Sequence, residues 1–478
     1  MSGKENSRVT RLPTTLGLAA AISLVIGSII GSGIFMKPAT MAAQLGSPEL
    51  LIAVWIGAGI ITLFGALSNA EVVTMVPETG GQYVFYKHMY GDFFAFLFGW
   101  SAFAVFNTAG TASIAYVLST YIEYFIELPR LAVGQERLID LYIPFIGHIY
   151  PFENIGVKGV TMLVLIGLTY LNYRSTSFGG KVLVVFTFLK VAAIGMLIMA
   201  IFFSPNGSVS HFFSEASSAS IHGWALIGAV VAALSGAFWA YDGWNNISFV
   251  SGEIKNPQVN IPRSLVIGIF VCIVIYVIIN LAYLYVLPID AIAASPMVAS
   301  DAGRLAFGTI GGGLIALMVI LSTLGSTQGN VLSVARVTFA MAGQKHFFAS
   351  MGKVHPRFQT PGNALWIHGI WSSMLVLSGT FDTLTDMVIF SSWFFYGMMA
   401  LGVIVLRKKW PDHDRPYRVW GYPYIPMIYV IFTFFFLALT LANDIANYAA
   451  GKTVIINSLL AIMITALGIP LYFYFRRK

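Results

Sequence analysis

Two apolar segments of this chain contain residues that interrupt a membrane helix. Residues 27–35 read GSIIGSGIF, and residues 235–246 read SGAFWAYDGWNN. An unpaired backbone N–H or C=O group costs several kcal/mol in hydrocarbon, so irregular backbone persists there only where it packs in protein or lines a cavity. The two breaks therefore predict a buried site at which free amides and free carbonyls can bind a ligand.

The two breaks differ in the polarity that they offer. The N–H groups of Ser32, Gly33 and Ile34 begin a half-helix, so we expect them to bind an anion. Carbonyl groups at the ends of the other half-helices are expected to attract a cation, and these belong to Ile29, Ile30, Phe238, Trp239 and Ala240. Amides that face carbonyls fit a zwitterion such as an amino acid. The alternative is that the glycines only allow close helix packing.

A lysine near the middle of the fifth apolar segment is the next unusual residue. Lys190 at that depth costs about 2.5–3.5 kcal/mol on insertion scales, so we expect a compensating partner. The candidates are carbonyls of the first break and the hydroxyls of Ser322 and Ser326, which lie one helical turn apart. The ammonium could take the place of a bound sodium ion or carry a proton. Snorkelling to the membrane surface is the alternative.

Aromatic and acidic side chains surround the second break. Trp239 is expected to act as a gate, that is, to close over a bound ligand and shut it from water. Tyr241 and Trp244 fit a gate and core packing equally well. Asp242 is expected to bind a ligand amine or a proton, or to cap the half-helix that follows it.

Polar side chains in two other apolar segments are weaker candidates. Asn107 and Thr108 lie in the third segment, and Tyr396 lies in the tenth. We expect Asn107 and Thr108 to contact a ligand, and Tyr396 to close the outer side of the cavity. Interhelical hydrogen bonding is the alternative for each of them.

Composition places these segments in a membrane protein without visible catalytic machinery. The chain is 57% hydrophobic and 10% charged, against about 25% charged in soluble proteins. Its one cysteine, Cys272, forms no intrachain disulfide, and its histidines lack metal-ligand spacing. We therefore expect no metal and no cofactor, and we do not expect an enzyme.

Apolar stretches of about 20 residues predict twelve membrane spans in an all-α protein, beginning near residues 14, 49, 92, 155, 181, 224, 263, 309, 362, 381, 422 and 453. On the side of the termini lie twenty basic residues, against five on the other: Arg130, Arg137, Lys158, Arg304 and Lys452. This bias predicts that both termini are cytoplasmic. The net charge of +7 then reflects orientation and contact with anionic lipid, without a nucleic-acid partner.

The order of the spans predicts an inverted repeat. A tail at 1–13 precedes five spans at 14–203, and five more follow at 224–405, each set beginning with a broken helix. Because five is odd, the two sets have opposite orientations, and two helices remain at 422–475. Broken helices in corresponding positions of two repeats are typical of secondary transporters.

Several motifs resemble a known family. Residues 27–35, followed by Pro38, resemble the first-helix signature of the amino acid–polyamine–organocation superfamily. Similarity to its L-type amino-acid transporter branch is carried by four stretches: AYDGWN at 240–245, GEIKNP at 252–257, GGQY at 80–83 and RPYRVWGYP at 415–423. The resemblance implies a LeuT-type five-plus-five inverted repeat and sodium-independent amino-acid transport.

By position, the resemblance implies roles for individual residues. It assigns Ser32, Gly33 and Ile34 to the substrate carboxylate, Ile29 and Trp239 to the ammonium group, and Lys190 to a vacated sodium position. Animal members join a heavy subunit through a cysteine after the third span, and residues 127–154 contain none. A stand-alone transporter of the microbial type in the cell membrane is therefore implied. Asp242 stands where animal relatives have glycine, which argues against a strictly large-neutral substrate range.

These residues favour one of four functions. Exchange of neutral L-amino acids is favoured over proton-coupled amino-acid symport. A channel would lack a closable centre such as the Trp239 gate provides. A membrane-embedded enzyme would need a metal set or a nucleophile–base pair, and neither is visible in the sequence.

Overall fold

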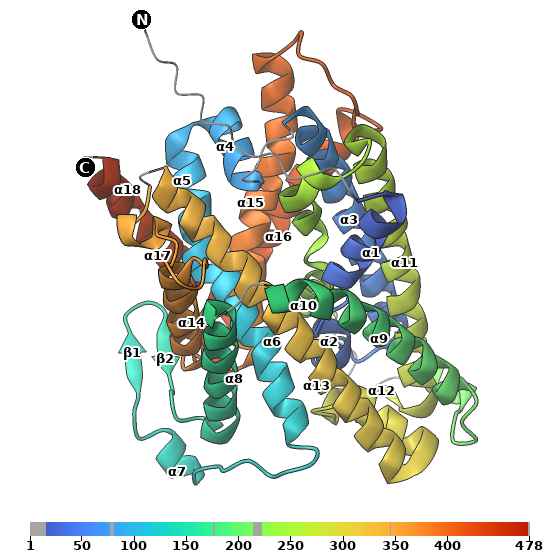
Figure 1. The fold of residues 1–478 in the computed structure, drawn as a ribbon. Helices are drawn as coiled ribbons and strands as arrows, with labels where there is room; N and C mark the ends of the chain where they lie inside the picture. The colour runs from blue at the N-terminus through green and yellow to red at the C-terminus, as the bar shows by residue number, and fades with distance from the viewer. Residues whose placement is uncertain (1–15, 77–80, 175–176, 214–221, 345, 477–478) are drawn as a thin grey trace, which may run out of the picture.

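The chain folds into a bundle of helices in the computed structural model, which describes residues 16–76, 81–174, 177–213, 222–344 and 346–476 (Figure 1). The expected tail at 1–13 lies outside the described residues. Within the described part, nine helices are long and apolar enough to cross a membrane, or ten if one bent pair is counted as a single span. This agrees with the expected all-helical membrane protein.

The first span is the bent pair. Helix α1 (Leu18–Ile29) and helix α2 (Gly33–Leu45) meet at an angle of 44°, so the break lies where the GSIIGSG stretch predicted it. Helix α2 ends at Gly46, whose φ of 61° is the left-handed conformation that glycine adopts freely. The Oγ of Ser47 then accepts a hydrogen bond from the Leu50 amide at 3.2 Å and caps α3 (Pro48–Met75).

The third span contains a local distortion. Helices α5 (Asp92–Ser101) and α6 (Asn107–Ile122) are joined by the π-helical turn η1 (Ala102–Phe106). The Oγ1 of Thr108 donates to the carbonyl oxygen of Phe103, five residues earlier, at 2.7 Å. Such π turns are frequent at functional sites. The other elements of the first half are α4 (Gln82–Tyr90), α7 (Val133–Glu136), α8 (Ile155–Arg174) and α9 (Ser177–Phe202).

The connection between α6 and α8 carries a small hairpin. Strands β1 (Leu141–Ile143) and β2 (Gly147–Ile149) pair antiparallel, with Tyr142 opposite His148. The hairpin lies at the edge of the bundle near α7 and α8 (Figure 1). The amide of His148 donates to the carbonyl of Val454 at 2.7 Å, which fixes the hairpin to the connection before α17 (Asn457–Ala466).

The second broken span differs from its expected form. Helix α10 (Trp224–Tyr241) runs without interruption through the Ser-Gly pair at 235–236. The chain leaves the helix only at Asp242, which is extended, and Gly243, whose φ is 104°. A 3-10 helix, η3 (Trp244–Glu253), follows. The break is therefore narrower than residues 235–246, because the apolar run before Asp242 keeps its helical hydrogen bonds.

The second half of the chain completes the bundle. Helix α13 (Val298–Gly343) bends at Gly308, which has a φ of 72°. Helices α9 and α14 (Gly362–Val376) cover segments that were expected to begin near residues 181 and 362, but neither is among the nine helices counted above in the described part. The remaining elements are η2 (Val209–Phe213), α11 (Pro257–Val286), α12 (Ile289–Ala294), α13 (Val298–Gly343), η4 (Ala349–Gly352), α14 (Gly362–Val376), α15 (Phe381–Lys409), α16 (Tyr424–Ala449), α17 (Asn457–Ala466) and α18 (Gly468–Arg476).

A buried carboxylate explains one of the sequence motifs. Glu71 of α3 is 1% exposed and accepts two hydrogen bonds of 2.8 Å from the guanidinium of Arg407 at the end of α15. The amide of Val419 donates to the same carboxylate at 2.7 Å. A bidentate charged pair of this kind fixes geometry strongly. The stretch at 415–423 is thereby held against the ends of α3 and α15.

Candidate functional site

A cavity lies between the two helix breaks. Of the residues expected to form a site, seven line it: Ile29, Ser32, Gly33, Asn107, Trp239, Asp242 and Tyr396. Four others, Ile30, Ile34, Phe238 and Ala240, are buried beside the breaks but do not line the cavity. The structure therefore joins the two breaks into one site. The expected coupling residues, Lys190, Ser322 and Ser326, do not line it.

The first break offers an amide-rich wall. Helix α2 begins at Gly33 and has no acidic residue in its first turn, so its leading N–H groups can receive an anion. The Oγ of Ser32 is buried and has no hydrogen-bond partner among the described residues. A buried, unpaired hydroxyl beside a helix N-terminus is a further donor for a carboxylate.

Gly33 also has a packing role. A Cβ atom at Gly33 would lie 2.5 Å from the Cα of Ala240, which is closer than two carbons can approach. At Gly31, which also lines the cavity, the nearest atom to such a Cβ is a backbone oxygen at 3.9 Å. Gly33 is therefore needed for close helix packing as well as for the wall of the cavity. Gly31 is not needed for close packing.

The carbonyl-rich wall carries a donor that the sequence did not suggest. The hydroxyl of Tyr276, in α11, lies 2.8 Å from the carbonyl oxygen of Ala240 and 3.1 Å from that of Ile29. A phenol has one proton to donate, so it serves these two carbonyls in turn. Tyr276 thus joins the ends of α1 and α10 directly, on the side where a ligand ammonium group was expected.

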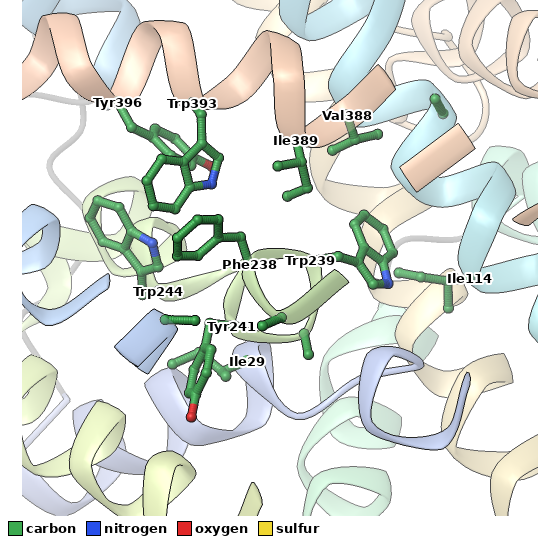
Figure 2. Packing of buried hydrophobic residues seen from close by; sticks show 14 of the residues in the cluster. Ile29, Ile114, Phe238, Trp239, Tyr241, Trp244, Val388, Ile389, Trp393 and Tyr396 are labelled. Atoms are coloured by element: carbon green, nitrogen blue, oxygen red, sulfur yellow. The ribbon is translucent and has the colours of Figure 1, made fainter. Parts of the chain in front are cut away.

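Neighbouring aromatic residues of α10 point in opposite directions (Figure 2). Trp239 lies beside Ile114 and Val388 and lines the cavity. Phe238 packs on Trp393, with 3.7 Å between ring centroids, and is 1% exposed. This placement suits Trp239 to the expected role of a gate and makes Phe238 a core residue.

Asp242 lies one residue before the N-cap position of the helix that follows it. The residue at the N-cap of η3 is Gly243, with no side-chain capping bond. The carboxylate of Asp242 instead accepts a hydrogen bond of 2.8 Å from the hydroxyl of Tyr396, and Asn245 donates to that hydroxyl at 3.0 Å. The side chain of Asp242 therefore faces Tyr396 of α15 and the cavity, and Gly243 occupies the N-cap position.

Lys190 is buried beside the first break. Its Nζ donates to the carbonyl oxygen of Gly27 at 2.6 Å, and the residue is 6% exposed. The Oγ of Ser322 is buried without a hydrogen-bond partner among the described residues, and Ser326 is partly exposed. One expected contact of Lys190 is therefore present, with the carbonyl, and no described hydrogen bond joins the lysine to either serine.

Comparison with known proteins decides the family. A family model described as amino acid permease matches residues 16–467. The chain belongs to the amino acid permease family. The serine/threonine exchanger SteT of Bacillus subtilis is 32% identical to this permease over 470 residues, which are 98% of each chain.

Two kinds of animal transporter are also similar to the permease. The human large neutral amino acids transporter small subunit 2 is 31% identical over 97% of the permease and 80% of its own chain. The mouse b(0,+)-type amino acid transporter 1 is 27% identical over 91% of the permease and 84% of its own chain. The resemblance to the L-type branch of the superfamily is thereby confirmed.

Several residues of this permease site were missed by sequence reasoning. Gln82 begins α4, is 1% exposed, lines the cavity and has an unpartnered Nε2 among the described residues. Gln82 belongs to the GGQY stretch at 80–83, and the sequence did not indicate that this stretch reaches the cavity. Asn330 of α13 also lines it. Lys37 does not line the cavity, but it and Lys190 are the two basic residues that the orientation count leaves within apolar segments.

Proposed function

We propose that this permease is a sodium-independent exchanger of neutral L-amino acids that works by alternating access. The observation that carries the proposal is the cavity between two broken helices, where Ser32 and Gly33 form one wall and Trp239 and Asp242 another. An amide-rich wall suits the carboxylate that all amino acids share. The activities for which the similar proteins are named, serine/threonine exchange and transport of large neutral amino acids, are in keeping with it.

The architecture that goes with this function is part of the proposal. The permease has twelve spans in a LeuT-type inverted repeat, with five at 14–203, five at 224–405 and two at 422–475. It lies in the cell membrane with both termini in the cytoplasm. Its single cysteine, Cys272, is buried in α11, so it works without a disulfide-linked heavy subunit.

The roles of individual residues are proposed as follows. The carboxylate binds at Ser32 and Gly33, with Ile34 behind them in the same turn, and the ammonium group binds near Ile29 and Trp239. Trp239 is the gate. Lys190 takes the place of a sodium ion, because its bond to the Gly27 carbonyl braces the first break against α9. A permanent charge there requires no ion to be cotransported.

Exchange is tested with purified protein in liposomes, in choline buffer without sodium. We expect uptake of labelled serine, alanine or leucine only when the liposomes contain an unlabelled neutral amino acid. Equal uptake into empty liposomes would contradict exchange. A strict need for sodium would contradict the role of Lys190.

Proton-coupled symport remains a second candidate because of Asp242. Its carboxylate borders the cavity and accepts a hydrogen bond from the neutral hydroxyl of Tyr396, and no lysine or arginine of the described part forms an ion pair with it. A carboxylate without a cation in such a place can take up a proton. Symport predicts uptake into empty liposomes that is driven by an inward proton gradient and is lost in Asp242→Asn.

A further inference from the structure

A buried ion pair joins the second half of the first span to the beginning of α15. Lys37 of α2 is 2% exposed, and its Nζ lies 2.6 Å from Oδ1 of Asp382 and 2.7 Å from Oγ1 of Thr385. The Oγ1 of Thr40 donates to the other oxygen of Asp382 at 3.3 Å. Two residues of α2 therefore hold two residues in the first turns of α15.

This cluster is in direct contact with the aromatic lining of the site. The ammonium of Lys37 lies 4.8 Å from the centroid of the Phe381 ring, in the geometry of a cation–π contact. The Phe381 ring packs edge-on against Trp239, at 6.2 Å between centroids. A displacement of Lys37 from α15 would therefore remove the support behind the proposed gate.

The same end of α15 is also fixed to α10. The Oγ of Ser235 donates to Oδ1 of Asp386 at 3.1 Å, one helical turn beyond Asp382. Asn457 of α17 donates to the second oxygen of Asp386 at 3.4 Å. The first turns of α15 thus form side-chain hydrogen bonds with both broken spans. Their partners are α2, which follows the first break, and α10, which precedes the second.

The exposure of the two charged partners is unequal, and this determines how the pair can open. The side chain of Asp382 is 44% exposed, whereas that of Lys37 is 2% exposed. Water can replace Lys37 as the partner of Asp382, but the lysine left in place would be a buried charge without a partner, which is strongly unfavourable. The pair can therefore separate only when α2 moves away from α15 far enough for water to hydrate the Lys37 ammonium.

We propose that Lys37 is a positioning residue that keeps the outer side of the cavity closed, and that its ion pair with Asp382 opens when the cavity turns outward. The proposal rests on the alternating-access function proposed above. In that topology Asp382 lies on the side opposite the termini, while two cavity residues, Phe98 in the second turn of α5 and Val337 in the last two turns of α13, lie toward the side of the termini. The conformation in which Lys37 closes the outer side of the cavity is then the same one in which the cavity is reached from the side of the termini.

The test measures access to the cavity from outside in cells that express the full chain, without any added amino acid. Ser392 lines the cavity and is replaced by cysteine, and the native chain serves as the blank because Cys272 is buried. A membrane-impermeant thiol reagent is added outside. We expect Lys37→Met and Asp382→Asn each to raise labelling of Ser392→Cys roughly tenfold, which corresponds to a shift of about 1.4 kcal/mol between the two states.

The double variant and a second lysine make the test specific. Because Lys37 and Asp382 act as a pair, Lys37→Met with Asp382→Asn should label no more than either single variant. Lys158 is a matched control, since it is also buried and its Nζ lies 3.0 Å from the carbonyl oxygen of Tyr150, away from α15. Lys158→Met should leave labelling at the parental level.

Two results would overturn the proposal. One is unchanged labelling in both single variants when the proteins reach the membrane at parental levels. The other is an equal rise in Lys158→Met, which would mean a general loosening of the bundle. If Lys37→Met does not fold, Thr385→Val removes one of its two hydrogen bonds and should raise labelling by a smaller factor. Since labelling needs no substrate, a rise without any amino-acid exchange would refute the proposed function and leave the role of Lys37 standing.

Discussion

The Nζ of Lys190 in α9 lies 2.6 Å from the carbonyl oxygen of Gly27 in α1, at the last turn before the first helix break. The two residues are 163 positions apart in the chain. Because an ammonium at this depth has no water to replace its partner, the contact ties the conformation of the break to that of α9.

Lys190→Ala should lower exchange by at least about tenfold, or about 1.4 kcal/mol in barrier terms, while substrate still binds. Removing the ammonium leaves the Gly27 carbonyl without its donor. Lys190→Arg should not restore full activity, because a planar guanidinium cannot replace a compact ammonium. Exchange and substrate affinity are measured separately, in liposomes and by calorimetry.

The pH profile of exchange distinguishes the two roles of Lys190. A fixed cation predicts a flat profile near neutrality, and a proton carrier predicts a titration that disappears in Lys190→Ala. Ser322→Ala should have a smaller effect than Lys190→Ala, since the serine hydroxyl has no described partner. Exchange by Lys190→Ala at the parental rate would refute both roles.

Gly33→Ala should abolish exchange, and Gly31→Ala should retain it. The added methyl at Gly33 would meet Ala240 at 2.5 Å, whereas at Gly31 the space is open. Overpacking of this kind costs about 1–3 kcal/mol and forces the two breaks apart. Substrate binding and the melting temperature are the measurements. Parental affinity in Gly33→Ala would show that the close approach to Ala240 is not needed.

Tyr276→Phe should destabilise the protein by about 1–3 kcal/mol, because two buried carbonyls lose the hydroxyl that they share. Exchange should fall as well, since α1 and α10 lose a common donor. Tyr283→Phe is the matched control in the same helix, because the Tyr283 hydroxyl is buried with no described partner. That change should be neutral or slightly stabilising in a thermal unfolding assay.

Trp239→Ala should reduce transport more than stability, and Phe238→Ala should reduce stability more than transport. Phe238 packs against Trp393 in the core, so its removal should cost about 3–5 kcal/mol of stability. Trp239 borders the cavity, so its removal should weaken or uncouple transport more than it lowers the amount of folded protein. If Trp239→Ala lost expression and the remaining protein exchanged normally, Trp239 would be a packing residue only.

His346, in the connection after α13, gives an expected pH dependence of stability. Burial lowers its pKa below the ordinary value of 6.5, and its Nδ1 is hydrogen-bonded to the hydroxyl of Tyr83. The unfolded chain then binds more protons than the folded chain below that pH, so this contribution is complete above pH 6.5 and is lost as the pH falls. The drop in melting temperature from pH 7.5 to 5.5 should be smaller in His346→Gln. An equal drop would contradict the assignment.

Much of the fold could be predicted because the relevant signals are local. An apolar stretch of about 20 residues is a property of the stretch itself, and the bend between α1 and α2 falls within residues 27–35 as expected. The length of the second break was harder to predict from the sequence. The Ser-Gly pair at 235–236 stays helical, since in a buried helix the surrounding packing outweighs the weak helix propensity of these residues.

The sequence by itself determined that the chain crosses a membrane, that two of its apolar segments are interrupted, that Trp239 belongs to the second interruption and that Lys190 lies within an apolar segment. These facts depend on hydropathy and on residue types whose cost in hydrocarbon does not depend on the fold. Only the tertiary structure decided which groups meet: Tyr276 with the carbonyls of Ile29 and Ala240, and Lys37 with Asp382, 345 residues away. A buried polar group must find a partner, but the sequence does not say which one, because helix packing alone brings distant residues within hydrogen-bond distance.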